Sequence, residues 1–134
     1  MISTEPSELQ MKEMRLLDQN TPFDMVNLLK YRDKALYEST ADNACGRTGR
    51  EAYNEYAKVV LPKIIGLGGS LVYRGQCNQY FVGDETQDYD ELIIVRYPSR
   101  AAYLTMFSSA EYQDAIRHRK AGLYFRVLHG CEMI

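Results

Sequence analysis

Residues 97–112, YPSRAAYLTMFSSAEY, contain two helix starts that lie nine residues apart. Ser99 follows a proline and is a suitable N-cap for a first helix, because its hydroxyl can accept a hydrogen bond from a free backbone N–H. Ser108 and Glu111 have the spacing of a second capping box, and Ser109 is an alternative cap. The stretch therefore predicts a short helix that bends into a longer one.

Residues 91–97, ELIIVRY, precede this stretch and show the clearest strand pattern in the chain. The other predicted elements of the core are strands at 23–31, 71–75 and 123–129, and a helix that begins at the Thr48–Glu51 capping box and ends at the glycines of 66–69. The order strand, helix, strand, strand, helix, strand is that of a ferredoxin-like α+β fold, βαββαβ. Such a fold has a four-stranded antiparallel sheet with its helices on one face.

Both faces of these strands carry apolar residues, as in Leu92 and Ile94 on one side of a strand and Ile93 and Val95 on the other. The helices can cover only one face of the sheet. The open face would exceed the roughly 300–600 Å² of contiguous apolar surface that monomers usually expose. We therefore expect a second copy of the chain to cover it, which predicts a homodimer.

The composition is that of an ordinary globular chain, with 134 residues and a formal net charge of -2. We expect an N-terminal helical extension at 1–20 and a single ferredoxin-like domain at 21–134. The sequence has no long run of like charge, so it indicates neither a nucleic-acid partner nor a membrane partner. Three cysteines without CxxC spacing and an acidic N-terminus without an apolar run predict a cytoplasmic protein with reduced thiols.

Several of these segments together resemble the bacterial domain-of-unknown-function family 1330, in the dimeric α/β-barrel superfamily. The resemblance rests on VNLLKYR at 26–32, AYNEYAKVVLPKIIGLGG at 52–69 and DELIIVRYPSRAAYLTMFSSAEYQ at 90–113. It implies a ferredoxin-like protomer whose sheet packs against the sheet of a partner. The superfamily includes cofactor-free monooxygenases, isomerases and haem-degrading enzymes, so the resemblance does not select one activity.

Arg74, Arg96 and Arg126 each interrupt a strand of mostly apolar or aromatic residues. A guanidinium in such a place reaches solvent, pairs with a carboxylate or meets an anionic ligand. If the face that carries Arg96 looks inward, Arg96 lies near Asn27 and Tyr31 of the first strand. These five residues are the predicted ligand-binding residues.

His118 and His129 are the predicted proton-transfer residues if the protein is an enzyme. The alternatives are a surface histidine among basic neighbours for His118 and a hydrogen-bonded structural group at a strand end for His129. The two histidines lie apart in the sequence, so no metal site is predicted. Haem is disfavoured because neither histidine lies convincingly on an inward helix face, and we expect no cofactor.

Other conspicuous residues have simpler interpretations. Four tyrosines at helical core spacings are expected to be packing residues, whereas Tyr31 and Tyr73 are the expected pocket hydroxyls. The acidic loop at 84–91 matches no calcium-binding loop and is expected to be solvated. The glycines of 66–69 end a helix, which argues against a phosphate-binding loop.

These observations predict a homodimer that binds a small organic molecule in a cleft between the sheet and the helices. An anionic group on that molecule suits the arginines, and a cofactor-free monooxygenase- or isomerase-like enzyme is one form of this function. The alternative is a non-catalytic dimerisation or protein-interaction module. An open interior favours the first interpretation and a filled interior favours the second.

Overall fold

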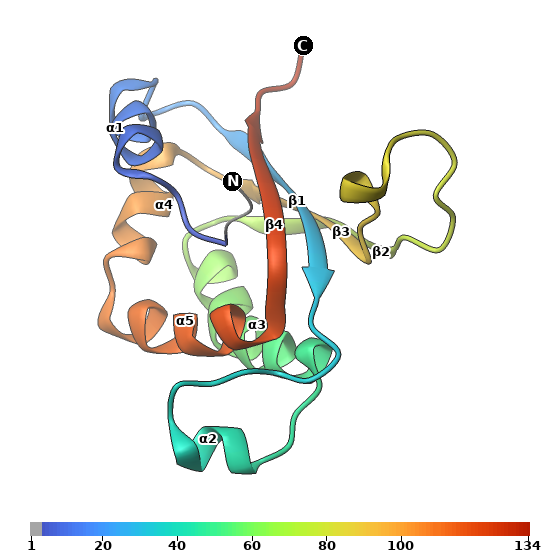
Figure 1. Cartoon of the computed structure of the whole chain (residues 1–134). Coiled ribbons are helices and arrows are strands. Elements are labelled where there is room, and N and C mark those ends of the chain that lie inside the picture. The colour runs from blue at the N-terminus through green and yellow to red at the C-terminus, as the bar shows by residue number, and fades with distance from the viewer. Residues whose placement is uncertain (1–3) are drawn as a thin grey trace.

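The computed structural model describes residues 4–134, so the first three residues of the expected N-terminal extension lie outside the described part (Figure 1). The elements follow in the order α1 (Glu8–Leu16), β1 (Phe23–Tyr31), α2 (Thr40–Ala44), α3 (Gly49–Gly66), β2 (Ser70–Gln76), η1 (Glu85–Gln87), β3 (Glu91–Tyr97), α4 (Arg100–Phe107), α5 (Ala110–Gly122) and β4 (Leu123–Cys131). Within residues 4–134, no helix has the length and apolar character needed to cross a membrane.

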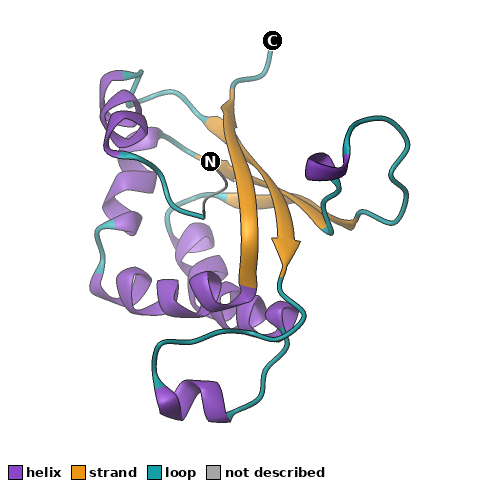
Figure 2. Ribbon diagram, viewed as in Figure 1, coloured by secondary structure: helices purple, strands orange, loops and turns teal. Residues whose placement is uncertain are grey.

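The four strands form one antiparallel sheet in the order β2-β3-β1-β4. Helices α3, α4 and α5 lie on one side of this sheet, as Figure 2 shows. This order and this layering confirm the predicted ferredoxin-like α+β fold. Helix α1 precedes the core and lies beside α4 (Figure 1).

The two helix starts of the opening stretch are both present. The hydroxyl of Ser99 accepts from the backbone N–H of Ala102 at the start of α4. Ser109 caps α5 by accepting from the N–H of Tyr112, so the alternative cap is the one used and Ser108 ends α4 instead. Two separate caps let the chain change direction between the helices and still satisfy the free N–H groups at both helix starts.

The register between β1 and β3 decides which side chains face the helices. Phe23 pairs with Tyr97 and Met25 pairs with Val95, and all four side chains are buried. Their partners in the helix layer include Tyr56, Val60, Ile64, Tyr103, Met106, Tyr112 and Ile116. The main apolar core therefore lies between this face of the sheet and the helices.

The opposite face of the sheet, called here the open face, carries the alternate residues of each strand. Val26 pairs with Ile94 and Leu28 pairs with Leu92, and these four side chains are half-buried. In the described chain no helix covers this face, although the loop at 77–90 projects on its side of the sheet (Figures 1 and 2). The open face is thus an apolar surface of the kind that usually meets a partner.

Three backbone segments meet where α3 begins. The N–H of Arg32 donates to the carbonyl of Gly122, and the N–H of Gly49 donates to the carbonyl of Arg32. A Cβ added at Gly49 would lie 2.0 Å from the Arg32 carbonyl oxygen and 2.6 Å from that of Gly122. Only glycine lets α3 begin this close to the ends of β1 and α5.

We expect Gly49→Ala to lower the free energy of unfolding by about 1–3 kcal/mol or more, because the added methyl group must push the backbone apart. Urea unfolding followed by circular dichroism measures this change. Gly66→Ala is the matched control, since a Cβ at this exposed helical position meets nothing within 4 Å. The control should be neutral or stabilising by up to about 1 kcal/mol; equal stability of both variants would contradict the close approach.

Candidate functional site

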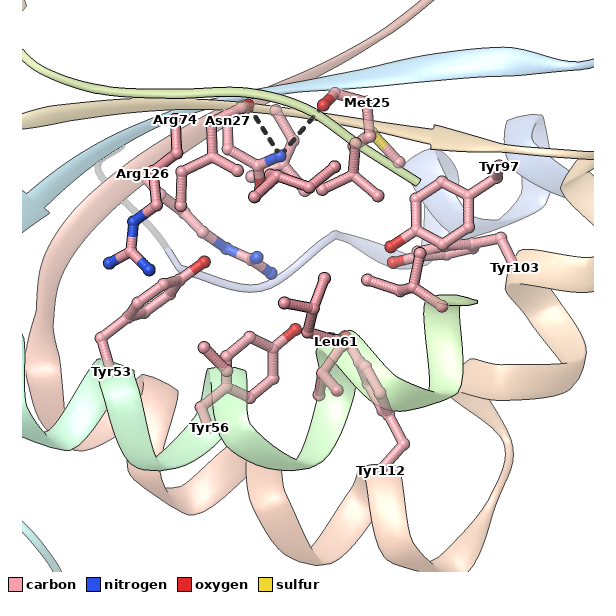
Figure 3. A pocket seen from close by; sticks show the side chains of 17 residues that line it. Met25, Asn27, Tyr53, Tyr56, Leu61, Arg74, Tyr97, Tyr103, Tyr112 and Arg126 are labelled. Carbon is pink, nitrogen blue, oxygen red and sulfur yellow. Dashed lines mark hydrogen bonds between the residues drawn. The ribbon is translucent and has the colours of Figure 1, made fainter. Parts of the chain in front are cut away.

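A cavity of about 80 Å³ lies between the helix-facing side of the sheet and the helices (Figure 3). We call it the inner cavity. Asn27, Arg74 and Arg126, three of the five predicted ligand-binding residues, line it. They come from β1, β2 and β4, so the sheet brings together side chains that are far apart in the sequence. The rest of the lining is mostly aliphatic and aromatic.

Five tyrosines line the inner cavity: Tyr53, Tyr56, Tyr97, Tyr103 and Tyr112. Figure 3 shows the hydroxyls of Tyr97 and Tyr103 next to each other at one end of it. Burial raises the pKa of Tyr53, Tyr97, Tyr103 and Tyr112 above the ordinary value for tyrosine. These four hydroxyls therefore stay protonated at neutral pH and are able to donate hydrogen bonds. The sequence identified the four helical tyrosines as packing residues but did not indicate that they also surround a cavity.

Arg74 reaches the inner cavity beside a buried carboxylate. Its Nε donates to Glu91 at 2.8 Å, and Arg50 donates to the other oxygen of Glu91 at 2.6 Å. Glu91 is only 3% exposed. The expectation that the whole acidic loop is solvated is therefore wrong for Glu91, which opens β3 on the helix-facing side. Glu91, Ile93 and Val95 are alternate residues of one strand, so this spacing in the sequence could have placed Glu91 on the same face as Ile93 and Val95.

A second pair of arginines, of which Arg126 lines the inner cavity, shares a different carboxylate. The side chain of Arg119 in α5 is fully buried and donates to the hydroxyl of Tyr112 at 2.9 Å and to Glu5 at 2.5 Å. Arg126 is 9% exposed; its Nε donates to the carbonyl of Thr4, and its Nη2 lies 4.0 Å from Glu5. Nothing in the sequence indicated Glu5 as the partner of Arg119.

Each of these two clusters contains two guanidiniums and one carboxylate. Arg50 and Arg74 share Glu91, while Arg119 and Arg126 share Glu5. The protonated tyrosines that line the cavity add no negative charge. Among the described residues, the surroundings of the inner cavity therefore contain more guanidiniums than carboxylates, which favours an anion. The side chains of Arg119 and Arg126 are nearly buried, whereas those of Arg50 and Arg74 remain partly exposed to solvent.

Asn27 is buried on the helix-facing side of β1. Its side-chain Nδ2 donates to the carbonyls of Met25 and Ile93 at 3.1 and 3.3 Å (Figure 3). These two bonds hold the amide in one orientation at the wall of the cavity. Asn27 is thus a fixed polar group in an otherwise apolar part of the lining.

Arg96 does not join this group, and the predicted cluster of Arg96 with Asn27 and Tyr31 is wrong. Arg96 pairs in register with Asp24, whereas Asn27 pairs with Ile93, so Arg96 and Asn27 lie on opposite faces of the sheet. Arg96 makes a bidentate ion pair with Asp24 at 2.7 and 2.9 Å on the open face. This hydrogen bonding lowers the pKa of Asp24 below its ordinary value.

Neither expected pocket hydroxyl lines the inner cavity. Tyr31 packs under Arg50, whose guanidinium lies 4.8 Å from the ring centroid, and burial raises the pKa of Tyr31. Tyr73 pairs with Ile94 on the open face and is half exposed. A register shift between Leu71 and Tyr73 separates it from the helix-facing side.

The two histidines lie apart from the inner cavity. His118 is 9% exposed, and its Nδ1 lies 2.6 Å from the hydroxyl of Tyr37 in the connection before α2. His129 is exposed and pairs with Val26 of the open face. The structure therefore brings neither histidine to the inner cavity. Within residues 4–134, no group of three His, Cys, Asp or Glu side chains gathers as metal ligands.

The fold and this interior define a small ferredoxin-like α+β protein with a mostly apolar cavity under its sheet, lined also by two arginines. The chain belongs to the DUF1330 family, described as a domain of unknown function, whose sequence pattern matches residues 46–129. This match confirms the resemblance that the sequence showed. No curated protein matches the chain.

Solved structures support the same fold. RPA0582, a protein of unknown function from Rhodopseudomonas palustris, is 28% identical with a TM-score of 0.89, over 100% of this chain and 98% of that chain. The structure of methylated RPA0582 is 29% identical in sequence with a TM-score of 0.89, and the match covers 100% of this chain and 97% of that chain. A dimeric ferredoxin-like protein of unknown function from Thermobifida fusca is 15% identical with a TM-score of 0.52, over 88% of this chain and 96% of that chain. At this low identity the similarity concerns the fold alone.

We predict that His118 makes the stability depend on pH. Burial, followed by the charges of Arg117 and Arg47, lowers the pKa of His118 below its ordinary value of 6.5. The unfolded chain then binds a proton that the folded chain does not, so stability is full above about pH 6.5 and falls as the pH decreases below it. His118→Gln should reduce the change of the free energy of unfolding with pH between about pH 7.5 and 5.5, as measured by urea unfolding.

His129→Gln is the matched control, because it removes the exposed histidine and leaves the contact between His118 and Tyr37 intact. The control should keep the pH dependence of the wild-type protein. If the free energy of unfolding of His118→Gln changes with pH as that of the wild type does, His118 does not control the pH dependence.

Proposed function

We propose that the protein binds a small organic anion in the inner cavity. The observation that carries this proposal is the excess of guanidiniums over carboxylates around a cavity lined by neutral tyrosine hydroxyls. A carboxylate would accept from Arg126 or Arg74 and from the hydroxyls, and its apolar part would contact the aliphatic lining. Asn27 would not donate to the carboxylate, because its side-chain N–H groups already donate to two backbone carbonyls; its amide oxygen could accept from a donor elsewhere on the ligand. Binding is proposed without a cofactor.

The size of the inner cavity limits what fits there. Its volume of about 80 Å³ is well below the roughly 300–1,000 Å³ of most ligand pockets. It is also smaller than the 150 Å³ engineered cavity that holds benzene. The inner cavity by itself therefore suits a short carboxylate. Since neither histidine reaches it, we place binding ahead of catalysis, and any proton transfer there would involve the tyrosines or the ligand itself.

We further propose that the protein acts as a homodimer in the cytoplasm, with the open faces of two sheets packed together. The half-buried apolar pairs of the open face support this assembly, because two such faces would shield one another from water. Dimerisation without ligand binding is the second candidate function. It shares the open face but makes no use of the arginines around the inner cavity.

We expect propanoate to bind more tightly than its neutral analogue propanamide, and Ala57→Leu to weaken propanoate binding by at least about tenfold. Ala57 lines the inner cavity, so a larger side chain fills the space. Nuclear magnetic resonance titration of the folded protein measures both affinities. Val59→Leu on the exposed side of α3 is the matched control and should bind as the wild type does. Equal binding of propanoate and propanamide would contradict the proposal.

We expect Ile94→Glu to shift the monomer–dimer equilibrium toward the monomer by at least about tenfold, because it places a carboxylate in the middle of the apolar open face. Light scattering coupled to size-exclusion chromatography measures the mass at several concentrations. Ile65→Glu, at a 60% exposed position in the helix layer, is the control and should leave the mass unchanged. A monomeric wild type, or a fully dimeric Ile94→Glu variant, would rule out this interface.

A further inference from the structure

A second, larger cavity lies next to the inner cavity. Its volume is about 580 Å³, and we call it the outer cavity. Met25, Tyr103, Arg126 and Leu128 line both cavities, so the two share a wall in which Arg126 is the charged residue. The outer cavity alone lies in the volume range of ordinary small-molecule sites.

The N-terminal segment, residues 4–17, forms one side of the outer cavity. It runs from the neighbourhood of β4 to α1, which lies beside α4 (Figure 1). Polar contacts hold its first described residues at the shared wall. The carbonyl of Thr4 accepts from Arg126 at 2.5 Å, and the carboxylate of Glu5 accepts from Arg119 at 2.5 Å and lies 4.0 Å from Arg126. A carboxylate thus already lies at the boundary between the two cavities.

Part of the outer cavity is suited to an apolar group, although Gln10, Glu13, Arg100 and His129 also line it. Met11 and Met14 of α1 line it opposite Phe23 and Met25 of β1. Methionine side chains are flexible and polarizable, so they adapt to apolar ligands of different shapes. The outer cavity therefore offers the apolar volume that the inner cavity lacks.

We propose that the ligand is a carboxylate with an extended apolar body, whose carboxylate replaces Glu5 at Arg126 and whose body occupies the outer cavity. This inference rests on the proposed function and extends it: the carboxylate lies at Arg126, which lines the inner cavity, and the apolar body extends into the outer cavity instead of filling the inner one. The N-terminal segment then acts as a built-in competitor: Glu5 satisfies the arginines without ligand and gives way when the ligand binds. Arg126 is the residue that recognises the ligand, since its guanidinium is nearly buried and reaches both cavities.

The experiment measures the binding of sodium octanoate, sodium acetate and 1-octanol to the full chain by isothermal titration calorimetry at constant ionic strength. The wild type should bind octanoate at least about tenfold more tightly than acetate or octanol. Glu5→Gln should raise the octanoate affinity by about tenfold, because it removes the competing carboxylate. Glu8→Gln is the matched control: it removes a carboxylate from the same segment at an exposed residue that does not line the outer cavity, and it should alter the affinity less than about twofold.

Two further variants test the two ends of the ligand. Arg126→Gln should lower the octanoate affinity at least about tenfold. Met11→Trp narrows the outer cavity and leaves Glu5 and the arginines in place, so it should remove the preference for octanoate over acetate. An unchanged preference in Met11→Trp would place the apolar body elsewhere and overturn the inference.

Glu5→Gln leaves the buried Arg119 without this carboxylate and is expected to unfold at a lower temperature. Octanoate should then raise its melting temperature more than that of the wild type, because the ligand supplies the missing carboxylate. No gain in either affinity or melting temperature over the wild type would overturn the role of Glu5. If propanoate still binds and Ala57→Leu blocks it, only this inference fails; if no carboxylate binds at all, the proposed function fails as well.

Discussion

Side chains alternate along each strand between two faces of a sheet, and helices cover only one of these faces. The rest of this structure depends on this one constraint. Residues that alternate along β1 and β3 point to opposite sides, so one register decides both the interior and the open face. It sends Asn27 and Glu91 toward the helices and the ion pair of Asp24 with Arg96 to the other side. The inner cavity and the proposed dimer interface are therefore two consequences of a single pairing.

Buried positive charge is the second feature that connects the fold with a function. Removing a guanidinium from water is costly unless an anion replaces the lost hydration. Here two carboxylates serve four arginines, of which Arg119 and Arg126 are nearly buried and Arg50 and Arg74 remain partly exposed. One carboxylate comes from the start of β3 and the other from the segment before α1. The more deeply buried pair, Arg119 and Arg126, depends on the segment that is not part of the ferredoxin-like core. The N-terminal extension thus takes part in the electrostatics of the interior.

Most of the fold could be predicted because local signals agreed with one another. The caps at Ser99 and Thr48 marked helix starts, and the apolar runs marked strands. The site was only partly predictable. Asn27, Arg74 and Arg126 meet at one cavity, whereas Arg96 was assigned to the wrong face because both faces of β3 are apolar. Where both faces look alike, alternation says which residues share a face but not which face the helices cover.

The sequence by itself determined the order of the elements, the double helix start between β3 and β4, and the presence of apolar residues on both faces of the sheet. These properties depend on neighbours a few residues apart, which a linear sequence displays directly. Only the tertiary structure decided that Glu5 meets Arg119, that Glu91 is buried with Arg74, and that His118 contacts Tyr37. Such contacts join residues from distant parts of the chain, and they depend on strand register and on how the helices and the N-terminal segment pack, which no local pattern encodes.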